Sequence, residues 1–193
     1  MEMFANLPVV FCESARQWED WLNESQGQLG GVWLKFAKKG TGVTSLSYSD
    51  ALDVALCHGW IDGLKQSYDN VFWLQKFTPR RPKSLWSRAN TARVTALIES
   101  GRLKPGGLRE VEAAKADGRW DAAYASQRTM TVPDDFQAEL DRSPLAKEFF
   151  ATLNGTNRYA ICYRIATAKK PETRKARIDT FIAMLLAREK LYP

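Results

Sequence analysis

The chain has 193 residues, 45% of them hydrophobic, and carries a formal net charge of +6. This length and composition predict one domain, or two closely packed subdomains, with a buried core. The sequence has no apolar run long enough to cross a membrane and no N-terminal secretion signal, so we expect a cytoplasmic protein that does not insert into membranes. Its three widely spaced cysteines have apolar neighbours, which predicts reduced thiols rather than a disulfide framework.

Charge is distributed unevenly along the chain. Residues 1–75 are acidic on balance, whereas residues 76–120 are strongly basic. Such asymmetry can steer an anionic partner, although a solvated excess of lysine and arginine is also common in globular proteins. The charge pattern by itself slightly favours anion binding.

The N-terminal part predicts a small antiparallel sheet of about three strands packed with helices. Ser14 and Gln17 form a capping-box pattern that starts a helix over residues 14–25, and glycines follow it from Gly27 onward. Ser47 starts a second helix. Strands are predicted in three segments, where apolar and polar residues alternate or the residue types favour an extended chain: 31–38, 64–67 and 71–78. The last two segments are predicted to form a hairpin.

From Ser84 onward every periodic segment is helical. Six helices are predicted, over residues 84–100, 105–117, 133–141, 144–154, 157–168 and 171–189. The fold class is therefore α+β, with an all-helical C-terminal part. The predicted organisation is an α+β region over 1–120, a linker over 121–132 and a helical module over 133–193.

The segment from Thr78 to Ser87 (TPRRPKSLWS) is the strongest local indication of a site. Its two prolines stiffen the chain before a helix that we expect to begin at Ser84. Free N–H groups at that helix start, together with arginine and lysine, would form a cradle for phosphate or carboxylate. The predicted ligand-binding residues are Trp60, Asp62, Arg80, Arg81, Lys83, Ser84, Trp86 and Ser87. Alternatively, the basic residues pair with the acidic N-terminal region and the prolines only shape a connection.

The segment HGWIDG, residues 58–63, contains the second candidate. Its glycines allow tight turns that could aim Asp62 into a cleft, as a base or as a partner of arginine. The purely structural interpretation, which we favour, is that Asp62 makes turn hydrogen bonds and Trp60 belongs to the core. His58 has only Cys57 beside it, and the spacing of metal sites and the motifs of nucleotide cofactors are missing, so no metal and no cofactor are expected.

A third cluster is basic and surrounds a predicted helix junction, with Lys169, Lys170, Arg174 and Arg177. It could bind nucleic acid or an acidic protein. A solvated helix face is the favoured alternative, since most aromatic residues of the chain have core spacing rather than that of a stacking platform.

Five segments together resemble one protein family: GVWLKFAKKGTG, SYSDALDVALCHGWIDG, FTPRRPKSLWS, EVEAAKADGRWDAAY and RYAICYRIATAKKPETRKARI. The chain resembles the YdeI/OmpD-associated family, also described as bacteriocin-protection proteins, over nearly its whole length. The resemblance implies a role in resistance to bacteriocins or antimicrobial peptides and an association with an outer-membrane porin. It implies no established enzyme activity or ligand. The missing export signal disagrees with direct contact to an outer-membrane protein.

Three functions follow from these observations, in order of preference. The first is a cytoplasmic accessory or stress-resistance protein that binds a small anionic ligand in a cleft lined by tryptophan and arginine. The second is a module that binds nucleic acid or an acidic protein through basic patches at 76–120 and 169–177. The third is an enzyme acting on a phosphorylated or carboxylated metabolite with Asp62 as base; we favour a binding protein over an enzyme.

Overall fold

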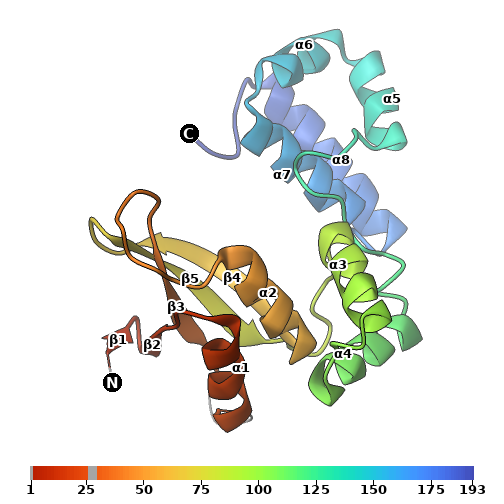
Figure 1. Cartoon of the computed structure of the whole chain (residues 1–193). Helices are drawn as coiled ribbons and strands as arrows, with labels where there is room; N and C mark the ends of the chain where they lie inside the picture. The colour runs from red at the N-terminus through yellow and green to blue at the C-terminus, as the bar shows by residue number, and fades with distance from the viewer. Residues whose placement is uncertain (1, 26–29) are drawn as a thin grey trace. The chain divides into compact units, whose positions relative to one another are not determined.

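The computed structural model describes residues 2–25 and 30–193 (Figure 1). Gly27, expected to follow the first helix, lies outside the described residues. Contacts divide the chain into two compact units. Unit 1 comprises Met1–Trp86 and Asn90–Ala122, and unit 2 comprises Ser87–Ala89 and Ala123–Pro193.

Unit 1 contains a five-stranded sheet, so the expectation of about three strands is wrong. The strands are β1 (Met3–Phe4), β2 (Leu7–Phe11), β3 (Val32–Ala37), β4 (Trp60–Ser67) and β5 (Phe72–Pro79). Their order across the sheet is β1-β2-β3-β5-β4. The sheet is also mixed rather than antiparallel, because β2 pairs with β3 in parallel. The hairpin of β4 and β5 agrees with the expected pairing, but β4 begins at Trp60 instead of Leu64.

The two missed strands have weak sequence signals. β1 and β2 are joined by Ala5 and Asn6, which have φ angles of +46° and +63°. Tight hairpins require such angles, but the usual marker is glycine rather than alanine. Pro8 lies within β2 and lacks an N–H, which argues against a strand. The parallel pairing to β3 needs a crossover connection, and the first helix provides it.

Two helices lie between the strands in the sequence, α1 (Ala15–Glu24) and α2 (Tyr48–Cys57). Two more follow the last strand, α3 (Arg88–Glu99) and α4 (Pro105–Ala116). The caps of the first two are confirmed, because Ser14 accepts a hydrogen bond from the Gln17 N–H and Ser47 accepts one from the Asp50 N–H. Helix α3 begins at Arg88, not at the expected Ser84.

Ser84 closes a turn and does not cap a helix. Its Oγ accepts a hydrogen bond from the backbone N–H of Arg81 at 3.1 Å, and its own N–H donates to the Arg81 carbonyl at 3.0 Å. Lys83, inside this turn, has a φ of +69°, which is incompatible with a right-handed helix. The proline-stiffened segment thus continues β5 up to Pro79 and is irregular from Arg80 to Trp86.

Helices α1 and α2 pack on one face of the sheet (Figure 1). Trp18 of α1 is fully buried, lies 5.6 Å from the ring of Phe77 in β5, and donates from Nε1 to the Ala51 carbonyl of α2 at 3.1 Å. On the other face, Trp33 packs with Val9 and Leu74 beneath the N-terminal hairpin. The central strand β3 is therefore apolar on the helix face, with Val32, Leu34 and Phe36, and carries Trp33 and Lys35 on the other.

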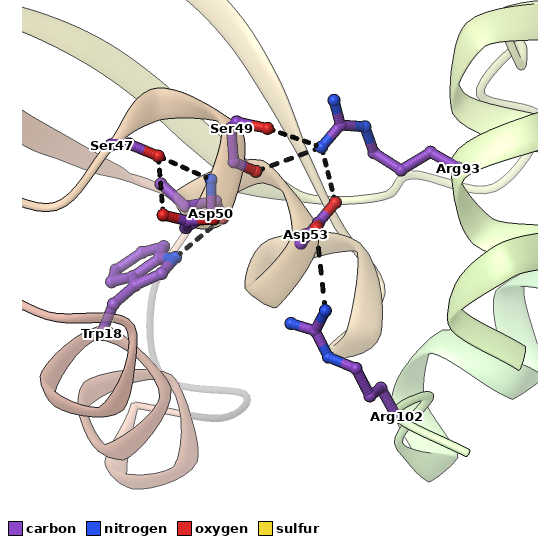
Figure 2. A network of polar contacts seen from close by, with 8 residues as sticks. Trp18, Ser47, Ser49, Asp50, Asp53, Arg93 and Arg102 are labelled. Carbon is purple, nitrogen blue, oxygen red and sulfur yellow. Dashed lines mark hydrogen bonds and ion pairs between the residues drawn. The ribbon is translucent and has the colours of Figure 1, made fainter. Parts of the chain in front are cut away.

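Polar contacts fasten α3 and the segment after it to α2. Arg93 donates to the Asp53 carboxylate at 2.6 Å and to the Ser49 carbonyl at 3.2 Å, while Arg102 lies 3.8 Å from the same carboxylate (Figure 2). Asp53 therefore joins two later segments to one helix.

Unit 2 is helical. It contains α5 (Asp134–Arg142), α6 (Pro144–Thr152), α7 (Gly155–Ala166) and α8 (Pro171–Leu186). Its core consists mainly of Phe136, Leu140, Phe150, Ile161, Ile165, Ile178, Phe181 and Leu185. The i, i+3, i+4 spacing of Ile178, Phe181 and Ile182 in α8 provides one side of this core, as the sequence predicts.

Three glycines let the start of α4 approach the end of α2. A Cβ on Gly107 would lie 2.5 Å from the Cys57 carbonyl oxygen, and one on Gly106 would lie 2.6 Å from that of His58. Gly59, which has a φ of +80°, meets the Gly106 carbonyl in the same way. The junction places the negative end of one helix dipole against the positive end of another, which is stabilising.

Replacing Gly107 by alanine should lower the free energy of unfolding by about 1–3 kcal/mol, because the new methyl group overpacks rigid backbone. The better helix propensity of alanine offsets only part of this cost. Urea unfolding measures the change. Gly30→Ala is the control, since no described atom lies within 4 Å of its added Cβ. Equal stabilities of the two variants would contradict the close approach.

Candidate functional site

Asp62 lies in β4 and its described contact is to α2. The hydroxyl of Tyr48, the first residue of α2, donates to its Oδ2 at 2.6 Å. Burial and the neighbouring Asp62 carboxylate raise the pKa of Tyr48 well above its usual value, so the phenol remains protonated. Asp62 is therefore held by a tyrosine, and not by the arginines expected beside it.

A β-bulge follows Asp62. Asp62 pairs with Phe77 and Lys65 pairs with Gln75, so two residues of β4, Gly63 and Leu64, lie opposite one residue of β5, Lys76. Gln75 is only 4% exposed, and its side-chain amide donates to the carbonyls of Gly63 and Leu64 at 2.8 and 3.2 Å. The bulge brings Lys65 to the same face of the sheet as Asp62, which a regular strand would not do.

Arg80 is buried, with 7% of its surface exposed. Its guanidinium carbon lies 3.5 Å from the centre of the Trp86 ring, and Nη1 donates to the Leu85 carbonyl at 3.3 Å. A second buried arginine, Arg119, pairs with Asp117 and donates to the Ser84 carbonyl at 2.8 Å. These two arginines fix the irregular loop from inside.

The other predicted residues of this loop have different environments. Arg81 and Lys83 are exposed. Trp86 is buried, with its ring centre 5.0 Å from that of Trp120. Ser87 belongs to unit 2, where it bridges to Tyr124. The expected cradle at a helix start is not formed, because no helix begins at Ser84.

A cavity of about 200 Å³ lies beside Arg80 in unit 1. Its lining residues are His58, Gly59, Trp60, Pro79, Arg80, Gly106, Arg109 and Glu110. Trp60 and Arg80 were predicted; Arg109 and Glu110 were not. The sequence signal that could have found them is the Pro-Gly-Gly start of α4, which brings this helix against the end of α2.

His58 is buried and lines this cavity. Its Nε2 lies 3.7 Å from Oε1 of Glu19, which in turn pairs with the Lys104 ammonium at 2.8 Å. Burial lowers the pKa of His58 below its usual range, and the Glu19 carboxylate opposes this only in part. The Lys104 ammonium holds the pKa of Glu19 below its ordinary value. A neutral imidazole thus faces the cavity near pH 7.

Comparisons with known proteins separate the two parts of the chain. Residues 10–110, just over half of the chain, match the family described as a domain of unknown function, DUF8412. The chain belongs to the DUF8412 family. Residues 129–188 match the family model described as "Bacteriocin-protection, YdeI or OmpD-Associated". No curated protein and no solved structure matches the chain.

The expected resemblance to YdeI/OmpD-associated proteins is thereby confirmed for the helical C-terminal domain. The DUF8412 region holds the cavity beside Arg80 and the Tyr48–Asp62 pair. In the described part of the chain, no group of histidine, cysteine and acidic residues could hold a metal ion. Likewise, no helix among the described residues is long and apolar enough to span a membrane.

In the C-terminal part that matches the YdeI/OmpD-associated model, two of the four predicted basic residues make internal contacts. Arg174 binds the Asp135 carboxylate through Nε at 2.6 Å and Nη2 at 2.7 Å, and its Nη1 donates to the Ile165 carbonyl. Arg177 donates to the Arg164 carbonyl. Both arginines thus satisfy carbonyls at the end of α7. Lys169 and Lys170 are exposed between α7 and α8.

Stability should depend on pH through His58. Its pKa is lower in the folded protein than in the unfolded chain, so the unfolded chain binds the extra proton. Stability should therefore fall as the pH drops below the unfolded value of about 6.5, by at most about 1.4 kcal/mol per pH unit. Urea unfolding at several pH values between 7 and 5 measures this pH dependence of stability. Because the chain has one histidine, His58→Gln should flatten the slope; an unchanged slope would refute this origin.

Arg174→Ala should lower the free energy of unfolding by about 1–2 kcal/mol, because it removes a bidentate ion pair and a bond to a helix carbonyl. The partial exposure of the pair keeps the effect below that of a buried one. Lys169→Ala, at an exposed position of the same junction, should change it by less than about 0.5 kcal/mol. Urea unfolding of the full chain compares them. Equal effects would show that Arg174 is an ordinary surface charge.

Proposed function

We propose that the DUF8412 region binds a small anion, a phosphate or carboxylate group, in the cavity beside Arg80. The observation that carries the proposal is the pair of arginines that line this cavity. Arg80 is buried and held on Trp86, and Arg109 comes from α4. A guanidinium fixed in place loses little side-chain entropy when it binds an oxyanion, and its planar donors match two oxygens at once.

The surroundings favour an anion of limited size. The cavity measures about 200 Å³, and its aromatic wall, Trp60, is 4% exposed. Poorly hydrated walls strengthen the attraction between arginine and oxyanion. Glu110 is the one carboxylate of the lining and partly balances the two cations when the cavity is empty of anion.

The biological role that we propose is that of a cytoplasmic accessory protein in stress resistance. The description of the C-terminal family names bacteriocin protection. All three cysteines are free and buried. Burial raises the pKa of the Cys12 thiol to about 11, which keeps it protonated and unreactive. Buried, unpaired thiols suit a reducing compartment.

Anion binding should raise the melting temperature. A phosphate concentration of 100 times Kd stabilises a folded protein by about 2.7 kcal/mol, which corresponds to roughly 5–10 °C for a chain of this size. Differential scanning fluorimetry with phosphate, citrate and sulfate measures the shift, against chloride at equal ionic strength. Arg109→Ala should abolish the shift without unfolding the protein, since Arg109 lies on the surface helix α4.

Arg16→Ala is the matched control, because Arg16 is exposed and makes only an i, i+4 pair with Asp20. It should keep the full shift. A shift that survives in Arg109→Ala, or that chloride reproduces, would contradict the site.

A further inference from the structure

A second cavity of unit 1 lies at the other end of α2, beside the hairpin of β4 and β5. It measures about 350 Å³, within the range of small-molecule sites. Its lining residues are Lys38, Lys39, Lys65, Gln66, Ser67 and Trp73. It shares no residue with the lining of the cavity beside Arg80.

The wall of this cavity is a fixed indole. Trp73 stacks on Phe36, with ring centres 4.7 Å apart and planes at 20°. Tyr48 packs against Trp73 with ring centres 6.2 Å apart, and Asp62 holds the Tyr48 hydroxyl. Because two aromatic neighbours set the orientation of Trp73, a flat ring could stack on it without a further cost of ordering.

Three lysines line the cavity together with this indole. Lys65 places its Nζ 4.4 Å from the ring centre of Trp73, and Lys38 donates to the Asp69 carbonyl at 2.6 Å. Within the described ranges none of Lys38, Lys39 and Lys65 forms an ion pair with a carboxylate. Lys38 shares its charge with the nearby Asp69 carboxylate, so Lys39 and Lys65 supply most of the positive charge that attracts an anion.

The bulge in β4 is what brings charge and ring together. Without the extra residue, Lys65 would lie on the face of the sheet opposite Asp62 and Trp73. The buried amide of Gln75 satisfies the carbonyls that the bulge exposes, so the irregularity is supported from within the sheet. Bulges of this kind re-aim side chains beside functional sites.

We propose that this cavity binds a nucleoside monophosphate, a phosphate joined to a flat aromatic base. The base stacks on Trp73 in the position that the Lys65 ammonium occupies, and Lys65 swings to the phosphate together with Lys39. An ammonium over a partly exposed indole gains about 0.5–1 kcal/mol, so its displacement costs less than the stacking of a base returns. The lysines then form charge-assisted hydrogen bonds to the phosphate oxygens.

Isothermal titration calorimetry with AMP, GMP and UMP on the full chain tests this. Nucleoside monophosphates should bind at a single site. Adenosine, which lacks the phosphate, and ribose 5-phosphate, which lacks the base, should each bind at least about 10-fold more weakly. Equal affinity for ribose 5-phosphate and AMP, binding of adenosine as tight as that of AMP, or no heat with any mononucleotide overturns the proposal. Binding of single-stranded oligonucleotides without binding of mononucleotides also overturns it.

Variants locate the site. Lys65→Gln and Lys39→Gln should each weaken AMP binding about 10-fold, and Trp73→Leu should weaken it further, whereas Trp73→Phe keeps a ring for stacking and guards against loss of folding. Lys76→Gln is the matched control, since Lys76 lies on the opposite face of β5 and should leave affinity unchanged. Arg109→Ala, which removes the other anion site, should also leave AMP affinity unchanged. Loss of AMP binding in Arg109→Ala with full binding in Lys65→Gln overturns the proposal.

Discussion

The arrangement of unit 1 depends on the contact between the end of α2 and the start of α4. Backbone meets backbone there, because Gly106 and Gly107 carry no side chains, and the Lys104 N–H donates to the Cys57 carbonyl at 3.1 Å. Such a contact has no flexible side chain that could yield, so it fixes the position of α4 within narrow limits. Arg109, one turn along α4, reaches the cavity beside Arg80 for this reason.

Helix α2 consequently has a different cavity at each end. Its last residues lead to His58 and Trp60, in a small space with two arginines. Its first residue, Tyr48, supports Trp73 in a larger space with three lysines. The two spaces differ in the way charge is held. The guanidinium of Arg80 is fixed by stacking and by a carbonyl, whereas the Lys65 ammonium has the Trp73 ring as its described contact.

The sequence predicted the features that local chemistry determines. Helix starts at Ser14 and Ser47 and the pairing of β4 with β5 depend on residues a few positions apart, and they are found. The N-terminal hairpin was missed because Ala5 has none of the preference for positive φ that marks such turns. Trp60 and Arg80 were recognised from their own neighbourhood. Arg109 could have been found only through the Pro-Gly-Gly start of α4, and Trp73 belongs to a cavity that tertiary packing assembles.

Arginine and lysine side chains have different roles in this chain, and the difference limits which of them can select a ligand. Three arginines donate hydrogen bonds to carbonyls or carboxylates of the protein itself: Arg80, Arg119 and Arg174. Such side chains orient a ligand only where they line a cavity, as Arg80 does. The lysines around Trp73 supply charge without a fixed direction, because an ammonium on a flexible stem accepts many geometries. A ligand of that cavity must therefore be selected by its ring, through the fixed plane of Trp73, and retained by its charge.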